Sequence, residues 1–188
     1  MSKILVAYFS LAGDNYSVGV VKEGNTRVMA KHISDYLKCD EYEIKGNIQY
    51  PQDYHGRTVQ AKEELKKKLR PELVNKLDNI SQYDTIFLGY PIYWGEPPMA
   101  VFTFLEKYDF SGKKVIPFCT HEGSGDAGTF SRLKKIIPKA NVNENGLSAY
   151  GHVARKEENR KGVERWLSCK NSKTYKRNSR LSLSIYSI

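Results

Sequence analysis

Aromatic side chains and turn-forming residues are concentrated in the stretch GYPIYWGEPP, residues 89–98. Its rings are Tyr90, Tyr93 and Trp94, and the glycines and prolines around them make it a poor interior for a helix or a strand. We therefore predict a surface loop that presents its rings to a flat ligand, since stacking on such a ring contributes roughly 0.5–1.5 kcal/mol beyond area burial. The alternative is that Trp94 packs under the following helix or forms a subunit interface.

A second candidate binding loop, SLAGDNYSVGVVKEGNT, covers residues 10–26 between a predicted strand and a predicted helix. Hydroxyl side chains and free backbone N–H groups before a helix suit a phosphate group. The loop matches neither the Gly-x-Gly-x-x-Gly dinucleotide loop nor the Gly-Lys-Ser/Thr loop of nucleotide triphosphatases. Residues 16–21 continue a helix poorly, so we place the helix start at Asn25 or Thr26 and treat residues 13–23 as an insertion. Ordinary helix capping by those two residues is the alternative.

The third loop, THEGSGDAG at residues 120–128, contains enough glycine for the backbone to approach a ligand closely. His121 could serve in catalysis, yet no second His or Cys stands near it at metal-ligand spacing, and there is no nucleophile elbow. A hydrogen-bonding or exposed histidine is the favoured interpretation, and catalysis stays open. We predict no metal site and no catalytic side chain, and we expect Cys119, inside an apolar strand, to be inert.

The remaining patterns describe the elements that hold these loops. Continuous apolar runs are typical of strands buried on both faces of a parallel sheet, and residues at helical spacing follow them. We expect strands at 4–9, 41–44, 85–90, 114–120 and 145–153, helices at 25–38, 57–69, 99–108, 129–137 and 158–167, and a loop at 47–56. Alternating strands and helices predict an open, mostly parallel α/β sheet, in which the three loops meet beyond the carboxyl ends of the strands. Pro117, inside a predicted strand, favours a bulge or an edge position.

The composition is that of one globular domain: 188 residues, 40% hydrophobic and 27% charged. No apolar run approaches the ~18 residues of a membrane span. The N-terminus MSKILVAYFS resembles a first strand rather than a signal peptide. Three widely spaced cysteines without a signal peptide predict reduced thiols and a cytoplasmic location.

The net charge of +9 is unevenly distributed along the chain. Residues 168–188 contain five basic side chains and no acidic one, so residues 1–167 carry only +4. We therefore divide the chain into a domain at 1–167 and a basic, Ser- and Lys-rich tail at 168–188, which we expect to be disordered or a non-native extension. A basic arm for an acidic partner is the alternative interpretation of this tail.

Five pieces of the sequence together resemble the flavodoxin family: ILVAYFS (4–10), GNTRVMAKHI (24–33), YPQDY (50–54), YDTIFLGYPIYWGEPP (83–98) and KVIPFCTHEGSG (114–125). They span most of residues 3–150, and the combination is far more specific than any single piece. The resemblance implies a flavodoxin-like three-layer α/β/α fold with a five-stranded parallel sheet in the order 2-1-3-4-5. It also implies FMN as the cofactor, with the phosphate held by hydroxyls and backbone amides.

Carried over residue by residue, the resemblance assigns the FMN site. The phosphate binders are Ser10, Asn25 and Thr26, with backbone groups from Leu11, Ala12 and Gly24. The residues that line the isoalloxazine ring are Pro91, Ile92, Tyr93, Trp94 and Gly95, and those that border its other edge are Thr120, His121, Glu122 and Gly123. Tyr54 approaches the site. The sequence departs from the family pattern because the insertion splits the phosphate loop and Ala12 stands where a hydroxyl residue is usual, so one phosphate hydrogen bond is lost or comes from the insertion.

The predicted function is that of an FMN-binding redox protein that transfers electrons between partner proteins. An NAD(P)H-dependent FMN or quinone reductase on the same fold is the alternative. Electron-carrier flavodoxins are typically strongly acidic, and a domain at +4 does not fit that mode of docking, although no separate nicotinamide-binding motif is visible. A third interpretation, a non-redox module whose basic tail binds nucleic acid, rests on charge alone. We expect no membrane partner and a monomer or a homodimer.

Overall fold

A parallel sheet organises the fold. The computed structural model describes residues 3–75 and 77–171. The strands of this sheet are β1 (Ile4–Tyr8), β4 (Asp40–Glu43), β5 (Thr85–Pro91), β6 (Lys114–His121), β7 (Asn141–Val142) and β8 (Leu147–Tyr150). They run in the order β4-β1-β5-β6-β7, and β8 also pairs with β6, all in parallel. The predicted order 2-1-3-4-5 is confirmed, with β7 and β8 sharing the last position.

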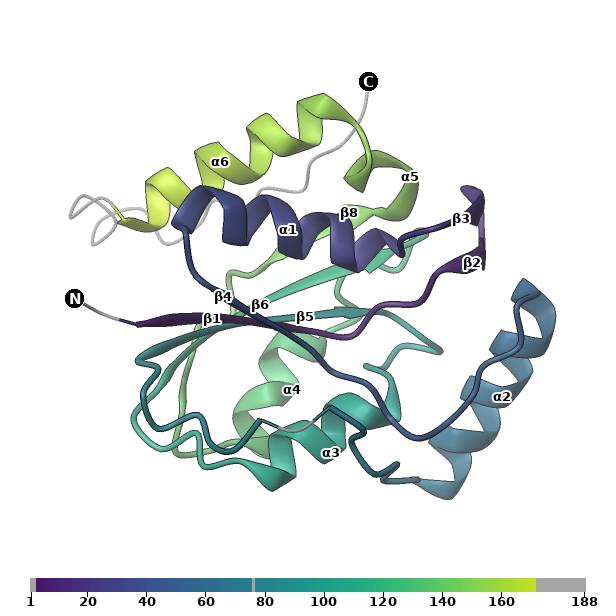
Figure 1. The fold of residues 1–188 in the computed structure, drawn as a ribbon, viewed down its shortest axis with the longest axis horizontal. Coiled ribbons are helices and arrows are strands. Elements are labelled where there is room, and N and C mark those ends of the chain that lie inside the picture. Colours follow the sequence, from purple (N-terminus) through teal and green to yellow (C-terminus); the bar gives the residue numbers. More distant parts are fainter. Residues whose placement is uncertain (1–2, 76, 172–188) are drawn as a thin grey trace.

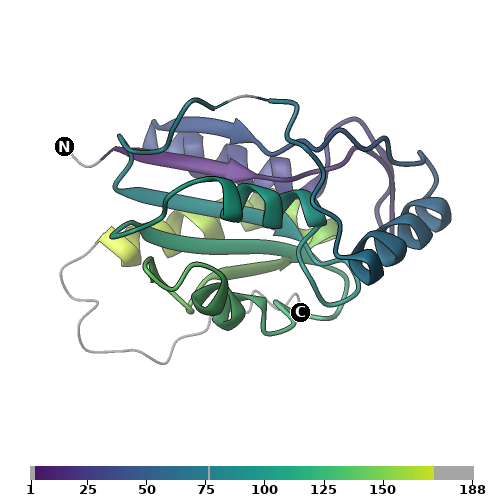
Figure 2. The same ribbon diagram turned by 90° about the horizontal axis from the view of Figure 1, so that it is seen from below.

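Helices cover both faces of the sheet (Figure 1). They are α1 (Asn25–Leu37), α2 (Tyr54–Lys67), α3 (Met99–Lys107), α4 (Thr129–Ile136), α5 (Gly151–Ala154) and α6 (Glu157–Asn171). α1, α5 and α6 lie on one face, and α3 and α4 lie on the other. α2 stands to one side, near the carboxyl ends of the strands, in both views (Figures 1 and 2).

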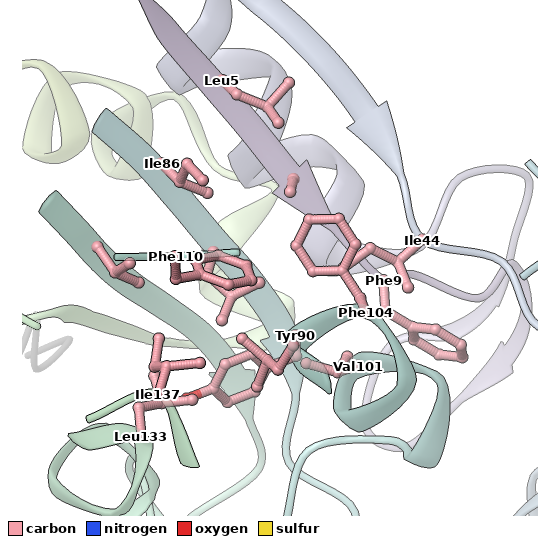
Figure 3. Packing of buried hydrophobic residues seen from close by; sticks show 14 of the residues in the cluster. Leu5, Phe9, Ile44, Ile86, Tyr90, Val101, Phe104, Phe110, Leu133 and Ile137 are labelled. Carbon is pink, nitrogen blue, oxygen red and sulfur yellow. The ribbon is translucent and has the colours of Figure 1, made fainter. Parts of the chain in front are cut away.

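The two faces of the sheet carry separate cores, because successive strand residues point to opposite sides. In β1, Val6 packs with α1 and α6, whereas Leu5 packs with α3 and α4. Figure 3 shows part of the second core, with Leu5, Phe9, Ile86, Tyr90, Phe104, Phe110, Leu133 and Ile137 among the labelled side chains. Burial on both faces explains why these strands have continuous apolar sequences rather than alternating ones.

The predicted insertion at 13–23 contains structure of its own. β2 (Gly13–Asn15) and β3 (Gly19–Val21) form an antiparallel hairpin, which the sequence analysis did not anticipate. Its backbone is tied to the segment before α2, because the Asp14 N–H donates to the Gln52 carbonyl at 3.1 Å. Figure 1 shows the hairpin at the same end of the sheet as the amino end of α1.

The predicted start of α2 and the predicted end of the last strand were wrong. α2 begins at Tyr54, inside the predicted loop 47–56, because Asp53 caps it by accepting a hydrogen bond from the Gly56 N–H at 2.7 Å. The predicted strand 145–153 ends at Tyr150, and the next residues turn into the short helix α5. By contrast, α1 begins at Asn25 as predicted.

Pro117 lies inside a strand with neighbours on both sides. It pairs with Leu88 of β5, while β7 pairs with β6 only at Lys114 and Val115, and β8 begins to pair at Phe118. Pro117 therefore sits at the gap between β7 and β8, and no ladder hydrogen bond is lost through its missing N–H. The predicted edge position exists only locally, as an interruption of the neighbouring strand.

The closing helix α6 continues to Asn171, past the predicted domain end at 167. The rest of the predicted tail, 172–188, lies outside the described residues. Within residues 3–75 and 77–171, no helix has both the length and the apolar character that a membrane crossing requires.

Candidate functional site

A cavity of about 230 Å³ opens at the carboxyl edge of the sheet, where the three candidate loops meet. Eight of the predicted site residues line it: Asn25, Pro91, Ile92, Tyr93, Trp94, Thr120, His121 and Glu122. The other predicted residues, Ser10, Leu11, Ala12, Gly24, Thr26, Gly95 and Gly123, do not line it. Most of the predicted ring-binding positions thus share one cavity, while most of the predicted phosphate loop lies outside it.

The aromatic loop makes a tight hairpin turn after β5. The Tyr93 N–H donates to the Glu96 carbonyl at 2.8 Å, and the Glu96 N–H donates back to Tyr93 at 3.0 Å. Both central residues have positive φ, 52° at Trp94 and 80° at Gly95, as a type I′ turn requires. Glycine accepts this conformation freely, but tryptophan adopts it at a cost, which points to a functional reason for the ring at this position.

The Trp94 side chain is partly exposed to solvent, and its indole N–H is held by a hydrogen bond. Its side chain is 55% exposed, and the indole N–H donates to the Thr58 carbonyl on α2 at 2.8 Å. Lys62 places its ammonium 4.8 Å from the ring centroid. The indole therefore lies over α2, not under the following helix α3, and its open surface is available to a ligand.

The other two rings of the aromatic loop are less exposed than Trp94. Tyr93 is half-buried, its ring meets Phe9 edge to face at 6.5 Å, and burial raises the pKa of its hydroxyl. Tyr90 is fully buried, and its hydroxyl lies 3.0 Å from that of Thr129. Tyr90 is thus part of the core beneath α4. Of the three rings in this loop, Tyr93 and Trp94 line the cavity, beside Pro91 and Ile92.

The amino end of α1 meets the loop after β1 at close quarters. A Cβ at Gly24 would overlap the Leu11 carbonyl oxygen and Ser10 Oγ, so only glycine fits there. Ser10 Oγ accepts a hydrogen bond from the Arg27 N–H at 3.1 Å, whereas the N-cap residue Gly24 contributes no side-chain cap. The loop split by the insertion is therefore closed again in space, and a hydroxyl lies at the positive end of the α1 dipole.

The two threonines predicted at the site bond to each other. The hydroxyls of Thr26 and Thr120 are 2.7 Å apart and buried. In such a pair one hydroxyl donates and the other keeps its own proton free for a further acceptor. Ser10 Oγ accepts from the Arg27 N–H, and its own proton has no acceptor among residues 3–75 and 77–171. The backbone of Ala12 is engaged differently from the prediction, since its carbonyl accepts from Arg57 Nη2 at 2.7 Å.

The loop after β6 turns its polar groups toward α1 and α5. His121 Nδ1 accepts the Gly123 N–H at 3.0 Å, and burial lowers the pKa of its ring. Glu122 Oε2 lies 3.3 Å from His152 Nδ1, while Oε1 is buried without a partner among the described residues. A Cβ at Gly151 would overlap both Glu122 Oε1 and the Asn25 amide, so carboxylate and amide are close neighbours.

Several residues that line the cavity were not predicted. Tyr16 of the hairpin and Tyr54 of α2 face it with ring centroids 5.4 Å apart, and only Tyr54 was expected near the site. Asp14, Asn15, Arg57, Thr58, Ala61 and Gly151 complete this set. Next to the cavity, Arg155 donates to the Glu23 carbonyl at 2.7 Å and to Asn25 Oδ1 at 3.2 Å. The insertion itself, flagged by its poor helix pattern, was the available signal for the hairpin residues.

Comparison with known families decides the classification. The sequence profile of the family described as Flavodoxin matches residues 3–167. The chain belongs to the flavodoxin family.

Several solved structures are similar to this flavodoxin and agree with that assignment. A candidate flavoprotein from Bacteroides uniformis ATCC 8492 is 30% identical, with a TM-score of 0.71, over 89% of this chain and 98% of that one. A second from Bacteroides eggerthii DSM 20697 is 31% identical, with a TM-score of 0.69, over 89% and 97%. A flavoprotein in complex with FMN from Lactobacillus acidophilus NCFM, 23% identical over 81% and 95%, has a TM-score of 0.58 and shares the fold. No curated protein matches the chain.

Among residues 3–75 and 77–171 of this flavodoxin, no group of three His, Cys, Asp or Glu side chains could hold a metal ion. Cys119 is buried, and burial raises the pKa of its thiol well above the ordinary value. A thiol in this state is a poor nucleophile, because the thiolate is the reactive form.

Proposed function

We propose that this flavodoxin binds FMN at the carboxyl edge of its sheet and transfers electrons through it. The observation that carries the proposal is the shared cavity, in which a half-exposed indole held on a strained turn, buried polar atoms and the amino end of α1 converge. The Lactobacillus flavoprotein, which has the same fold, was crystallised in complex with FMN, and this supports the proposal.

The residues at the ring end fit a flat heterocycle. Trp94 offers its open face, and the Tyr16 and Tyr54 rings stand on the hairpin side of the same cavity. A cavity of about 230 Å³ is somewhat below the roughly 300–1,000 Å³ typical of small-molecule sites. It matches the ring portion of FMN better than the whole molecule, which leaves the phosphate outside, at the amino end of α1.

The residues at the phosphate end also fit. Free protons remain on Ser10 and on one of the paired threonines, and the helix dipole of α1 favours an anion. The close approach of Gly24 to the loop after β1 creates a cradle that any side chain would fill. Arg155, which donates to Asn25 Oδ1, supplies a positive charge beside the amino end of α1.

FMN would supply the redox chemistry when bound, and the chain would supply binding, orientation and electrostatics. Trp94 and Tyr93 would hold the ring and exclude water from one side. Ser10, Asn25 and Thr26 would hold the phosphate. No side chain of the chain itself has to accept or release a proton for electrons to pass.

The physiological partner is part of the proposal. We propose a redox partner protein and a cytoplasmic setting. The NAD(P)H-dependent FMN or quinone reductase remains the alternative, favoured by the charge of only +4 that the sequence assigns to residues 1–167, because an electron carrier is usually steered to its partner by strong acidity. The nucleic-acid interpretation rests on a tail that falls mostly outside the described residues.

Absorbance spectroscopy without oxygen separates these functions. The protein is mixed with FMN, desalted and treated first with NADPH and then with stepwise dithionite, with free FMN and NADPH as the control. We expect retained flavin bands that NADPH leaves unchanged and that dithionite bleaches in separate one-electron steps. Prompt bleaching by NADPH would instead identify a reductase, and a protein that retains no FMN would refute both.

A further inference from the structure

Arg57 is a buried cation in the wall of the cavity, and it has no anionic partner among the residues that the structure describes. Its side chain comes from α2 and is only 4% exposed. Its guanidinium nitrogens Nη1 and Nη2 donate to the carbonyls of Asp14 at 3.0 Å and Ala12 at 2.7 Å, with longer contacts to Pro51 and Gln52. Among residues 3–75 and 77–171, no carboxylate forms an ion pair with it, and its buried Nε has no hydrogen-bond partner.

A buried charge that lacks a counter-ion is costly, so such a group favours any neighbour that becomes negative. Arg57 lies close enough to Tyr93 to act on it: burial raises the pKa of the Tyr93 hydroxyl, Arg57 opposes this rise, and Tyr54 and the buried Glu64 add to it. Two acidic groups also line the cavity, but both have other contacts. Asp14 accepts the Tyr54 N–H at 3.2 Å, and Glu122 faces His152.

We propose that Arg57 sets the redox preference of the site by favouring reduced over oxidised FMN. The proposal rests on the function proposed above. Two electrons from the donor and one proton from solvent leave FMN with one negative charge more than before, and the buried guanidinium attracts that charge. Asp14 and Glu122 also contribute to the redox potential of bound FMN. The proposal concerns only the change in that potential that Arg57 makes.

The size of the effect follows from the dimensions of the cavity. A compact space of about 230 Å³ keeps its contents within about 10 Å of a residue in its wall. At that distance, with an effective dielectric constant of about 20, one unit charge changes the ratio of two charge states somewhat more than tenfold. We therefore expect Arg57 to raise the ratio of the oxidised-FMN to the reduced-FMN dissociation constant about tenfold, which is about 30 mV for a two-electron couple.

The alternative role for Arg57 is structural, since its hydrogen bonds fasten the hairpin to α2. The variant Arg57→Lys separates the two roles, because lysine keeps the charge but not the planar fork that reaches several carbonyls. The variants Arg57→Gln and Arg57→Met both remove the charge, with side chains of different polarity, so that one misfolded protein does not end the test. Lys66→Gln, an exposed change on the same helix, is the control for loss of a positive charge.

The experiment measures oxidised-FMN affinity by flavin fluorescence and the potential of bound FMN by spectroelectrochemical titration, with folding checked by circular dichroism. We expect the dissociation-constant ratio to fall about tenfold in Arg57→Gln and Arg57→Met and to stay within about threefold of the unmodified protein in Arg57→Lys and Lys66→Gln. An unchanged ratio in the neutral variants overturns the proposal, as does an equal fall in Arg57→Lys. Failure of the unmodified protein to bind FMN would refute the proposed function first, and this inference with it.

Discussion

Removal of the Trp94 ring should weaken FMN binding, while glycine at this position should relieve the strain of its positive φ. Trp94 is 55% exposed, so about 110 of its roughly 200 Å² remain open. If a bound ring covers half of that area, burial contributes about 1.4 kcal/mol at about 25 cal/mol/Å². Stacking adds about 1 kcal/mol. The sum, about 2.4 kcal/mol, corresponds to a roughly fiftyfold change in dissociation constant.

Two truncations of Trp94 test this expected change in the FMN dissociation constant. Trp94→Ala and Trp94→Gly both remove the ring, so both should raise the FMN dissociation constant about fiftyfold in a fluorescence titration of the apoprotein. The φ of 52° favours glycine, so Trp94→Gly should be more stable than Trp94→Ala by about 1 kcal/mol in urea unfolding. Trp94→Phe, which keeps a stacking face, is the matched control and should bind within about fivefold of the unmodified protein. An Ala variant that binds FMN as tightly as the unmodified protein would refute the stacking role.

Three further predictions concern the loop at Gly24, the Arg155 side chain and two half-buried histidines. Gly24→Ala should destabilise the protein by about 1–3 kcal/mol in thermal unfolding, because its Cβ overlaps the Leu11 carbonyl and Ser10 Oγ; unchanged stability would mean that the loop has room. Arg155→Gln should weaken FMN about threefold and leave riboflavin, which lacks the phosphate, unchanged, with Lys156→Gln as the control; equal effects on both flavins would contradict a phosphate contact. Burial lowers the pKa of His32 and of His121 below the ordinary 6.5, so the unfolded chain binds more protons than the folded one in the window just below that value. Stability should therefore fall in urea unfolding as pH drops from about 7.5 to about 5.5, less steeply when both are Gln; an unchanged slope in that double variant would contradict it.

Much of the sheet could be predicted because its strands are buried on both faces. Residues 4–9, 85–90 and 114–120 are continuous apolar runs, and each lies on a strand of the central sheet. The order of the strands came from the family resemblance, since composition and periodicity carry no information about which strands are neighbours. The hairpin β2–β3 was missed because its strands, GDN and GVV, are too short to show an alternating pattern.

The ring-binding side of the site was predictable, and the charged part was not. The proline, glycine and aromatic residues after β5 predict an exposed loop from residue types alone. Arg57 opens the strongly charged helix predicted at 57–69, and nothing in that pattern distinguishes a buried arginine from a solvated one. His152 and Arg155 were missed because the last strand was predicted to run to 153, which placed His152 on a strand and Arg155 after it.

Retention of FMN is the measurement that tests the central claim most directly. The purified protein is mixed with excess FMN, passed through a desalting column and examined by absorbance, with Trp94→Ala treated in parallel. We expect the unmodified protein to elute with one FMN per chain, seen as flavin absorbance bands in the protein fraction, and the variant to show weaker bands. Flavin that elutes entirely as free FMN from the unmodified protein would contradict this claim.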